Sequence, residues 1–146
     1  MTKAIYFDMD GTIADFYGVD GWLDCLMNND VKPYKVAKPL INMSALARRL
    51  NKLQREGWHI GIVSWLSKSG NEVFNTQTTI TKMEWLHRHL PSVNWDEYNF
   101  LNYGTPKHER VMYADGILFD DEERNRENWS GIAYEETHII EVLKSL

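Results

Sequence analysis

The sequence has little cysteine, no long hydrophobic run and no excess of positive charge. Its one cysteine, Cys25, cannot form a disulfide within the chain, and no Cys/His cluster has the spacing of a structural zinc site. The N-terminus has too short an apolar run for a signal peptide, and no window approaches the length of a membrane span. These absences predict a cytoplasmic protein that has no membrane partner.

Composition and charge limit the chain further. The length of 146 residues suits one domain, and 43% apolar with 25% charged residues is typical of a globular protein. A net charge of -5 gives no general attraction for the backbone of a nucleic acid. We therefore expect a single domain over residues 1–146 with one site.

Short apolar strands alternate with helical patterns along the chain. Strands are expected at residues 4–7, 58–63, 98–102, 116–119 and 131–134. Helices are expected at residues 16–27, 40–56, 80–90, 107–113 and 139–143, and loops at 28–39 and 71–79. Continuously apolar strands in this order predict an α/β fold with three layers, in which helices cover both faces of a parallel sheet.

Two of the expected helices have specific signals. In the first, leucines at positions 46, 50 and 53 share one face, Ser44 is the expected N-cap and Gly57 the stop. In the second, an apolar face is expected from Ile80, Met83, Trp85, Leu86 and Leu90, and Pro91 closes the helix.

Polar side chains follow three of the expected strands. Asp8 and Asp10 follow the first strand, Ser64 the second, and Asp120 with Asp121 the fourth. In parallel sheets ligands bind at the carboxyl ends of the strands, so these groups are expected at one edge. Close carboxylates repel one another unless a cation lies between them, and oxygen ligands suit Mg²⁺. Asp120 and Asp121 also fit a plainer role at a helix N-terminus, which is compatible with metal binding.

These side chains can carry phosphoryl transfer. A carboxylate can attack phosphorus directly, and Asp8 at the strand end is the expected nucleophile. Asp10 would protonate the leaving oxygen and later activate water, provided that the chain turns sharply after Asp8. Lys107 and the hydroxyl of Ser64 would neutralise and orient the phosphoryl group, although each also fits a purely structural role.

The pattern Asp8-Met9-Asp10-Gly11-Thr12 after an apolar strand resembles the DxDGT motif of the haloacid dehalogenase superfamily of phosphohydrolases. Ser64, Lys107 and the Asp120-Asp121 pair follow in the family's order. The resemblance implies a Rossmann-like fold, Mg²⁺ as cofactor and Asp8 as nucleophile and metal ligand. It implies that Asp10 is the acid/base and binds the metal through its main-chain carbonyl. Gly11 and Thr12 would support the phosphate loop, and Asp120 or Asp121 would complete the metal site.

Family members differ in the cap that controls access to the site. Only residues 16–39 leave room for a cap here, so the resemblance implies a minimal one. The run from Asp8 to Phe16 looks similar to the entry of the 5′(3′)-deoxyribonucleotidases, which hold a base with aromatic side chains. This implies a nucleotidase acting on a (deoxy)nucleoside monophosphate, in which the candidates for contact with the base are Phe16, Tyr17, Trp22 and Trp65. Each of these aromatic residues also fits a packing role.

Two other functions stay open. The Asp120-Asp121 pair with the following run, residues 122–129, resembles the phosphatase domain of polynucleotide kinases, which remove 3′-phosphates from nucleic-acid ends. The acidic net charge and the lack of a P-loop speak against it. The other alternative is a nucleotide-binding module that no longer hydrolyses, although every motif position keeps a competent side chain.

Overall fold

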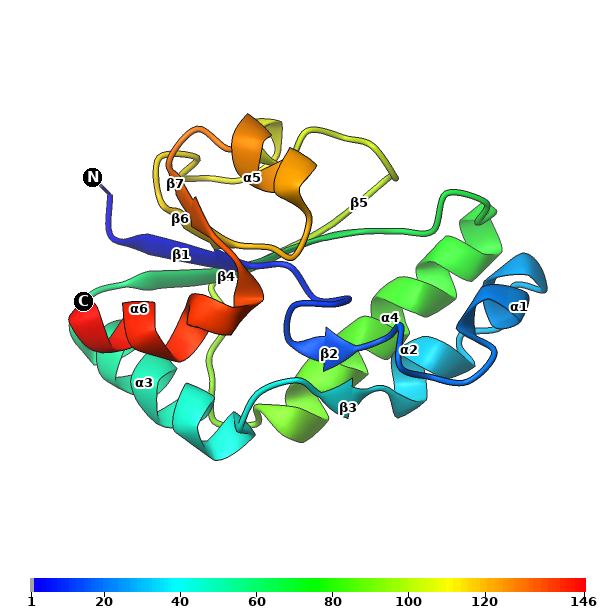
Figure 1. Cartoon of the computed structure of the whole chain (residues 1–146), viewed down its shortest axis with the longest axis horizontal. Coiled ribbons are helices and arrows are strands. Elements are labelled where there is room, and N and C mark those ends of the chain that lie inside the picture. Colours follow the sequence, from blue (N-terminus) through cyan, green and yellow to red (C-terminus); the bar gives the residue numbers. More distant parts are fainter. Residues whose placement is uncertain (1) are drawn as a thin grey trace.

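The computed structural model describes residues 2–146 and has a five-stranded parallel sheet at its centre (Figure 1). Its strands are β1 (Ala4–Phe7), β4 (His59–Trp65), β5 (Glu97–Leu101), β6 (Ile117–Phe119) and β7 (Ile132–Tyr134). They lie in the order β5-β4-β1-β6-β7, with β1 in the middle. This confirms the predicted α/β fold, and each predicted strand is present to within a few residues.

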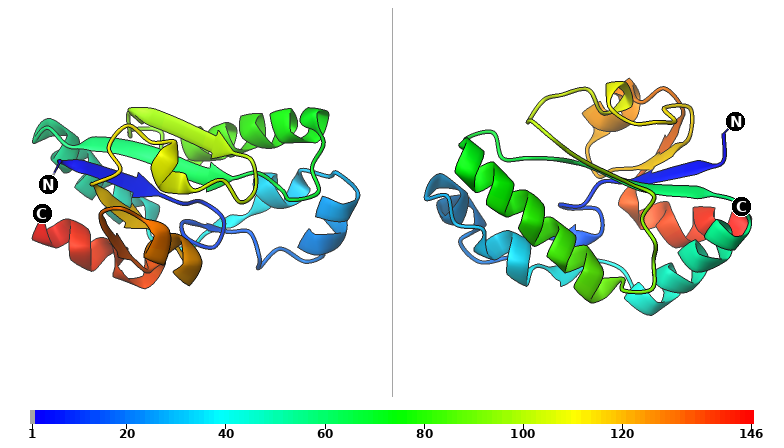
Figure 2. Two further views of the ribbon diagram at one scale, coloured as in Figure 1. Left: turned by 90° about the horizontal axis from the view of Figure 1, so that it is seen from above. Right: turned by 180° about the vertical axis from the view of Figure 1, so that it is seen from behind.

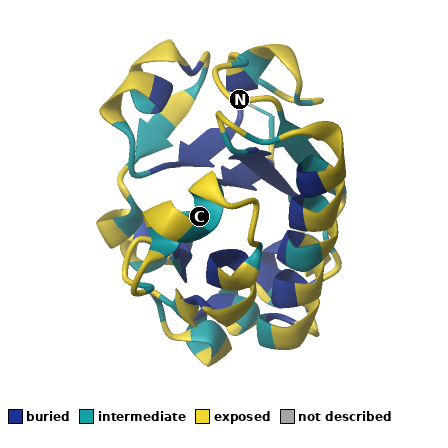
Figure 3. Ribbon diagram, turned by 90° about the vertical axis from the view of Figure 1, so that its right-hand side faces the viewer, coloured by how far each residue is buried: buried dark blue, intermediate teal, exposed yellow. Residues whose placement is uncertain are grey.

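Helices cover the sheet on both faces (Figure 2). One face carries α3 (Met43–Arg55), α4 (Glu72–His89) and α6 (Ile139–Ser145), whose apolar side chains join the main core. The other face carries α5 (Glu123–Asn128) and a smaller cluster built around Tyr6, Leu118 and Trp129. Figure 3 shows the buried strands inside and the exposed outer faces of the helices. The three layers that the sequence predicts are therefore present.

Helix α3 has its predicted buried face and its predicted stop. Leu46, Leu50 and Leu53 are buried, and Gly57 adopts a φ of 92°, a left-handed conformation that glycine favours. The predicted N-cap was wrong: the side chain of Asn42 accepts a hydrogen bond of 2.9 Å from the amide of Ala45. Asn is as good an N-cap as Ser, so composition alone did not separate the two positions.

Helix α4 starts eight residues before its predicted start, so the predicted loop at 71–79 was wrong. Asn71 caps it by accepting a 2.8 Å hydrogen bond from the amide of Phe74. Ile80 and Met83, expected on the inner face, are exposed instead. The buried stripe is Phe74, Thr78, Lys82, Trp85 and Leu86. Two polar residues in this stripe broke the apolar periodicity from which a helix is predicted.

Residues 16–39 form a small helical segment beside α4. The helical stretch predicted at 16–27 shrinks to α1 (Trp22–Met27), and the loop predicted at 28–39 contains α2 (Lys32–Val36), which starts with a proline in its first turn. The strand β3 (Lys38–Pro39) pairs with β2 (Ala14–Asp15) and closes the segment. The segment packs on the first half of α4 through Phe16, Tyr34 and Phe74.

Two smaller points complete the fold. The helix predicted at 107–113 is only a short 3-10 helix at Lys107–Glu109. Within residues 2–146, no helix has both the length and the hydropathy that crossing a membrane requires.

Candidate active site

The loop after β1 turns sharply at the carboxyl edge of the sheet. The amides of Thr12, Ile13 and Ala14 all donate to the carbonyl of Met9 at 3.0 to 3.1 Å. Gly11 permits this turn with a φ of 84°, and a Cβ at this position would overlap the carboxylate of Asp121. Both the backbone conformation and the close packing therefore require glycine here.

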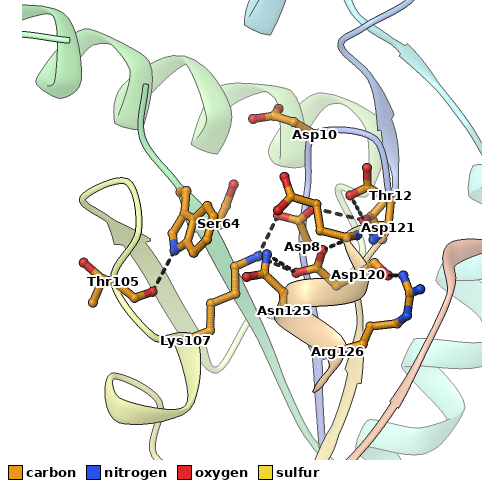
Figure 4. Close-up of polar contacts among 12 residues, drawn as sticks. Asp8, Asp10, Thr12, Ser64, Thr105, Lys107, Asp120, Asp121, Asn125 and Arg126 are labelled. Atoms are coloured by element: carbon orange, nitrogen blue, oxygen red, sulfur yellow. Dashed lines mark hydrogen bonds and ion pairs between the residues drawn. The ribbon is translucent and has the colours of Figure 1, made fainter. Parts of the chain in front are cut away.

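Three carboxylates from two strand ends meet beside this loop (Figure 4). Asp8, Asp120 and Asp121 each offer an oxygen, and these oxygens lie within 4.8 Å of one another. The hydroxyl of Thr12 lies between them: it is 3.0 Å from Oδ2 of Asp8 and accepts a 3.1 Å hydrogen bond from the amide of Asp121. Thr12 thereby connects the first motif to the aspartate pair.

Lys107 places a buried ammonium group against this acidic cluster. Its Nζ lies 3.0 Å from Oδ1 of Asp8 and 2.6 Å from Oδ2 of Asp120. Burial lowers the pKa of Lys107, but the two carboxylates outweigh burial and raise it above its ordinary value. The direction of this shift favours the charged form of the side chain. Asn125 donates a further hydrogen bond of 3.2 Å to Asp120.

The aspartate pair has strongly shifted acidity. Burial, together with the charge of Asp8, raises the pKa of Asp120 to about 6 and that of Asp121 to about 8. A divalent cation would relieve this repulsion, and a set of carboxylate oxygens is the donor type that Mg²⁺ prefers. Asp8, Asp120 and Asp121 therefore fit a magnesium ion.

The carboxylate of Asp10 lies apart from this triad (Figure 4). Its Oδ2 lies 2.9 Å from Nζ of Lys82, a buried residue of α4. The same Nζ donates to Oγ of Ser64 at 2.8 Å and to the carbonyl of Trp65 at 2.9 Å. Burial raises the pKa of Asp10 above its ordinary value, although Lys82 partly offsets this shift. Ser64 is fully buried, and its hydroxyl is connected to Asp10 through the ammonium group of Lys82.

A cavity of about 690 Å³ opens in front of Asp8 and Asp10. The four predicted aromatic residues all line it. Its other aromatic and polar lining includes Tyr34, Tyr103, Lys68, Lys107, Glu122 and Asn125. Phe16 stacks on Tyr34 with ring centroids 4.7 Å apart, and the rings of Trp65 and Tyr103 form a second pair in the lining, with centroids 5.0 Å apart. The space is far larger than a phosphate group needs.

The fold thus brings the predicted motif residues to one edge of the sheet, and it adds residues that the sequence reading missed. Lys82, Asn125, Tyr34 and Tyr103 lie in or beside the site. If the start of α4 had been recognised, the spacing of Lys82 from Phe74 and Leu86 would have placed this lysine on the buried face of the helix. Tyr34 lies in the loop predicted at 28–39, Tyr103 follows the strand predicted at 98–102, and neither carries such a signal.

Comparison with known proteins gives structural similarity without sequence similarity. No protein-family profile matches the chain, and no curated protein sequence matches it. Among solved structures, the crystal structure of D,D-heptose 1,7-bisphosphate phosphatase from Burkholderia thailandensis is similar, with a TM-score of 0.52 and 15% sequence identity. The match covers 86% of this chain and 70% of that chain. At this identity the likeness establishes the fold.

Proposed function

Because the chain has the fold of the haloacid dehalogenase superfamily phosphatases, we propose that it is a magnesium-dependent phosphomonoesterase with Asp8 as nucleophile. One observation carries the proposal: the carboxylates of Asp8, Asp120 and Asp121 converge within 4.8 Å beside the ammonium group of Lys107, and Asp8 and Lys107 line the cavity. A buried cluster of this kind is costly to the fold, so it is best explained by a reaction that uses it.

The proposed chemistry assigns each of these side chains a part. The Asp8 carboxylate attacks phosphorus and forms an aspartyl phosphate, while Asp10 gives a proton to the leaving oxygen. Asp10 then takes a proton from the water that hydrolyses the intermediate. Lys107 neutralises charge on the transferring phosphoryl group, and Thr12 holds the Asp8 carboxylate in place. Magnesium held by Asp8, Asp120 and Asp121 would supply positive charge for the phosphate oxygens.

The cavity supports a nucleoside monophosphate as substrate. Residues 16–39 act as a small cap in this proposal and supply one aromatic wall, with Phe16, Tyr17 and Trp22. Trp65 also lines the cavity and lies close to Lys107, whose Nζ is 5.6 Å from the centroid of its ring. Aromatic rings in the lining suit a flat base, while the phosphate reaches Asp8.

A 3′-phosphorylated nucleic-acid end is the second candidate, because cations lie against two aromatic side chains that line the cavity. The guanidinium of Arg124 lies 5.1 Å from the ring centroid of Trp65, and Nζ of Lys68 lies 5.9 Å from that of Tyr103. Cations beside aromatic rings suit the backbone and bases of a single strand. The net charge of -5 makes this candidate the weaker one.

Phosphate release from a substrate panel tests the proposal. The panel holds nucleoside monophosphates, deoxyribose 5-phosphate, a sugar bisphosphate and a 3′-phosphorylated oligonucleotide, each with Mg²⁺ or with EDTA. We expect the highest kcat/KM for a nucleoside monophosphate, a large loss for deoxyribose 5-phosphate, which lacks the base, and no turnover in EDTA. Preference for the oligonucleotide would select the second candidate. Tight binding of a nucleotide without release of phosphate over hours would indicate a module that does not hydrolyse.

The variant Asp8→Asn tests the mechanism itself. The amide cannot form the acyl phosphate, so turnover should fall by at least about 10⁴-fold while the fold is retained. Asp24→Asn, at an exposed aspartate of α1, is the matched control and should keep the wild-type rate. An Asp8→Asn variant with a nearly normal rate would exclude Asp8 as the nucleophile.

A further inference from the structure

Lys82 is a buried ammonium group with every donor engaged. Lys82 is 1% exposed. Its Nζ donates to Oδ2 of Asp10, to Oγ of Ser64 and to the carbonyl of Trp65 at 2.8 to 2.9 Å. A lysine side chain has three N–H donors, so these three acceptors use all of them. The ammonium is therefore held in one position, and it holds its partners in return.

The core of the protein gives no packing reason for a lysine at this place. Position 82 belongs to the buried stripe of α4, between Thr78 and Trp85. Burying an ammonium group is unfavourable before its partners are counted, whereas Leu or Met would fill such a position without that cost. The charge at position 82 is therefore best explained by what it does to Asp10.

The contacts of Lys82 restrict only one of the two oxygens of the Asp10 carboxylate. Oδ2 is held by Lys82, while in residues 2–146 no donor lies within hydrogen-bond distance of Oδ1. Asp10 also lines the cavity in front of Asp8. One oxygen is thus fixed on the closed side, and the other is left available to a group in the cavity.

From these contacts we propose that Lys82 is a positioning residue, which fixes the Asp10 carboxyl for proton transfer to the leaving oxygen. In this step an oxygen of Asp8 forms a bond to phosphorus with its electron pair. The bond from phosphorus to the leaving oxygen breaks, its electron pair goes to that oxygen, and the oxygen takes the proton of Asp10. Lys82 touches none of the reacting atoms.

Lys82 also connects this carboxyl to the second motif and to residues 16–39. Through Ser64 and Trp65 it ties Asp10 to the end of β4. Its Nζ lies 5.0 Å from the ring centroid of Tyr34, which stacks on Phe16 in the wall of the cavity. The lysine thus fixes Asp10 relative to the sheet and to the aromatic wall together.

The inference rests on the proposed function, and the dependence on the leaving group tests it. Alkoxide leaving groups need a proton, whereas p-nitrophenolate leaves without one. In Lys82→Met, kcat/KM for an alkyl phosphate should fall by about 10²-fold or more, since general acid catalysis contributes about 10²–10⁴-fold. For p-nitrophenyl phosphate it should stay within a factor of about 3. The ratio kcat/KM is used because it reports the step in which the leaving group departs.

Two further variants complete the test. Thr78→Val, one turn away on the same buried stripe, should leave both substrates unaffected. The double variant Asp10→Asn/Lys82→Met removes both charges of the pair, and it should match Asp10→Asn alone on both substrates, because Lys82 acts through Asp10. This comparison decides the question even if Lys82→Met alone does not fold, which circular dichroism would reveal.

Failure of the positioning role and failure of the proposed function would give different results in these experiments. Equal losses on the alkyl and aryl substrates in folded Lys82→Met would overturn the positioning role, as would a double variant much slower than Asp10→Asn. Either result would leave the phosphatase function standing. A wild-type protein that releases no phosphate from either substrate would overturn the proposed function, and the role of Lys82 with it.

Discussion

Replacing Lys107 by Met should destabilise the protein more than any exposed lysine substitution. Its ammonium group is buried and lies 3.0 Å from Asp8 and 2.6 Å from Asp120. Removing one partner of a buried ion pair costs about 3–5 kcal/mol, because the charge that remains has no counter-ion. Lys107→Met leaves two such carboxylates, so we expect a loss of about 3–5 kcal/mol in the free energy of unfolding at pH 8 without magnesium.

The same loss should depend on pH and on magnesium. At pH 5 the carboxylates of the variant can take up protons, so the loss should shrink. Magnesium stabilises the folded state by about 2.7 kcal/mol at a concentration 100 times its Kd, and it should stabilise the variant more than the wild type, because the variant cluster lacks one cation. Activity at saturating magnesium should fall by about 10²–10³-fold, since the phosphoryl group loses a fixed positive charge.

Urea unfolding of wild type and variant at pH 5 and pH 8, with and without Mg²⁺, measures these quantities. Lys52→Met is the matched control, because Lys52 is exposed and its ion pair with Glu56 is 3.7 Å long. The control should lose no more than about 1 kcal/mol. If Lys107→Met loses as little as the control at pH 8 without magnesium, Lys107 does not balance the acidic cluster and the reasoning fails.

Two other predictions follow from the pKa shifts. Since the pKa values of Asp120 and Asp121 are raised to about 6 and about 8, Mg²⁺ must displace protons. The affinity of the protein for Mg²⁺ should rise from pH 6 to pH 8. Over the same range the stability of the metal-free protein should fall, because Asp121 ionises. Calorimetry that finds a constant affinity would contradict this prediction. Burial raises the pKa of Glu97, but hydrogen bonds from Asn99 and Tyr6 outweigh it and lower the pKa overall. Glu97→Gln should therefore lower the free energy of unfolding by about 1–3 kcal/mol near pH 7. This loss should disappear as acid protonates the wild-type carboxylate below about pH 4. A loss that persists below that pH would refute the stabilising role of the ionised carboxylate.

The strands and the ordered motif residues could be read from the sequence because local signals mark them. The apolar run at residues 4–7 ends at Asp8, and the run at 116–119 ends at Asp120. The carboxyl ends of parallel strands lie at one edge of a sheet, so these signals are enough to predict that the two aspartates lie close together. That a single domain carries its cap at residues 16–39 stays a prediction.

Helix α4 and its contribution to the site could not be read in the same way. The first half of α4 contains one Asn and three Thr, residues that are not favourable inside a helix, and its inner face includes Thr78 and Lys82. Burial of a lysine makes sense only once Asp10 and Ser64 are known to lie within reach, and those contacts join positions 18 and 72 residues apart. Pairing over such distances is a property of the folded chain.

The charges of the completed site support its proposed use. The charged side chains of the site form two groups: Asp10 pairs with Lys82, while Asp8, Asp120 and Asp121 gather around Lys107. In the second group, three formal negative charges and one positive charge leave -2, which is the charge that one divalent cation balances. The two lysines have different partners. Lys82 pairs with the carboxylate that is proposed to transfer protons, and Lys107 pairs with carboxylates that are proposed to hold the metal and to attack phosphorus. One cation therefore completes the balance without displacing either lysine, and this agreement between charge and position favours a magnesium phosphatase over a site that holds no metal.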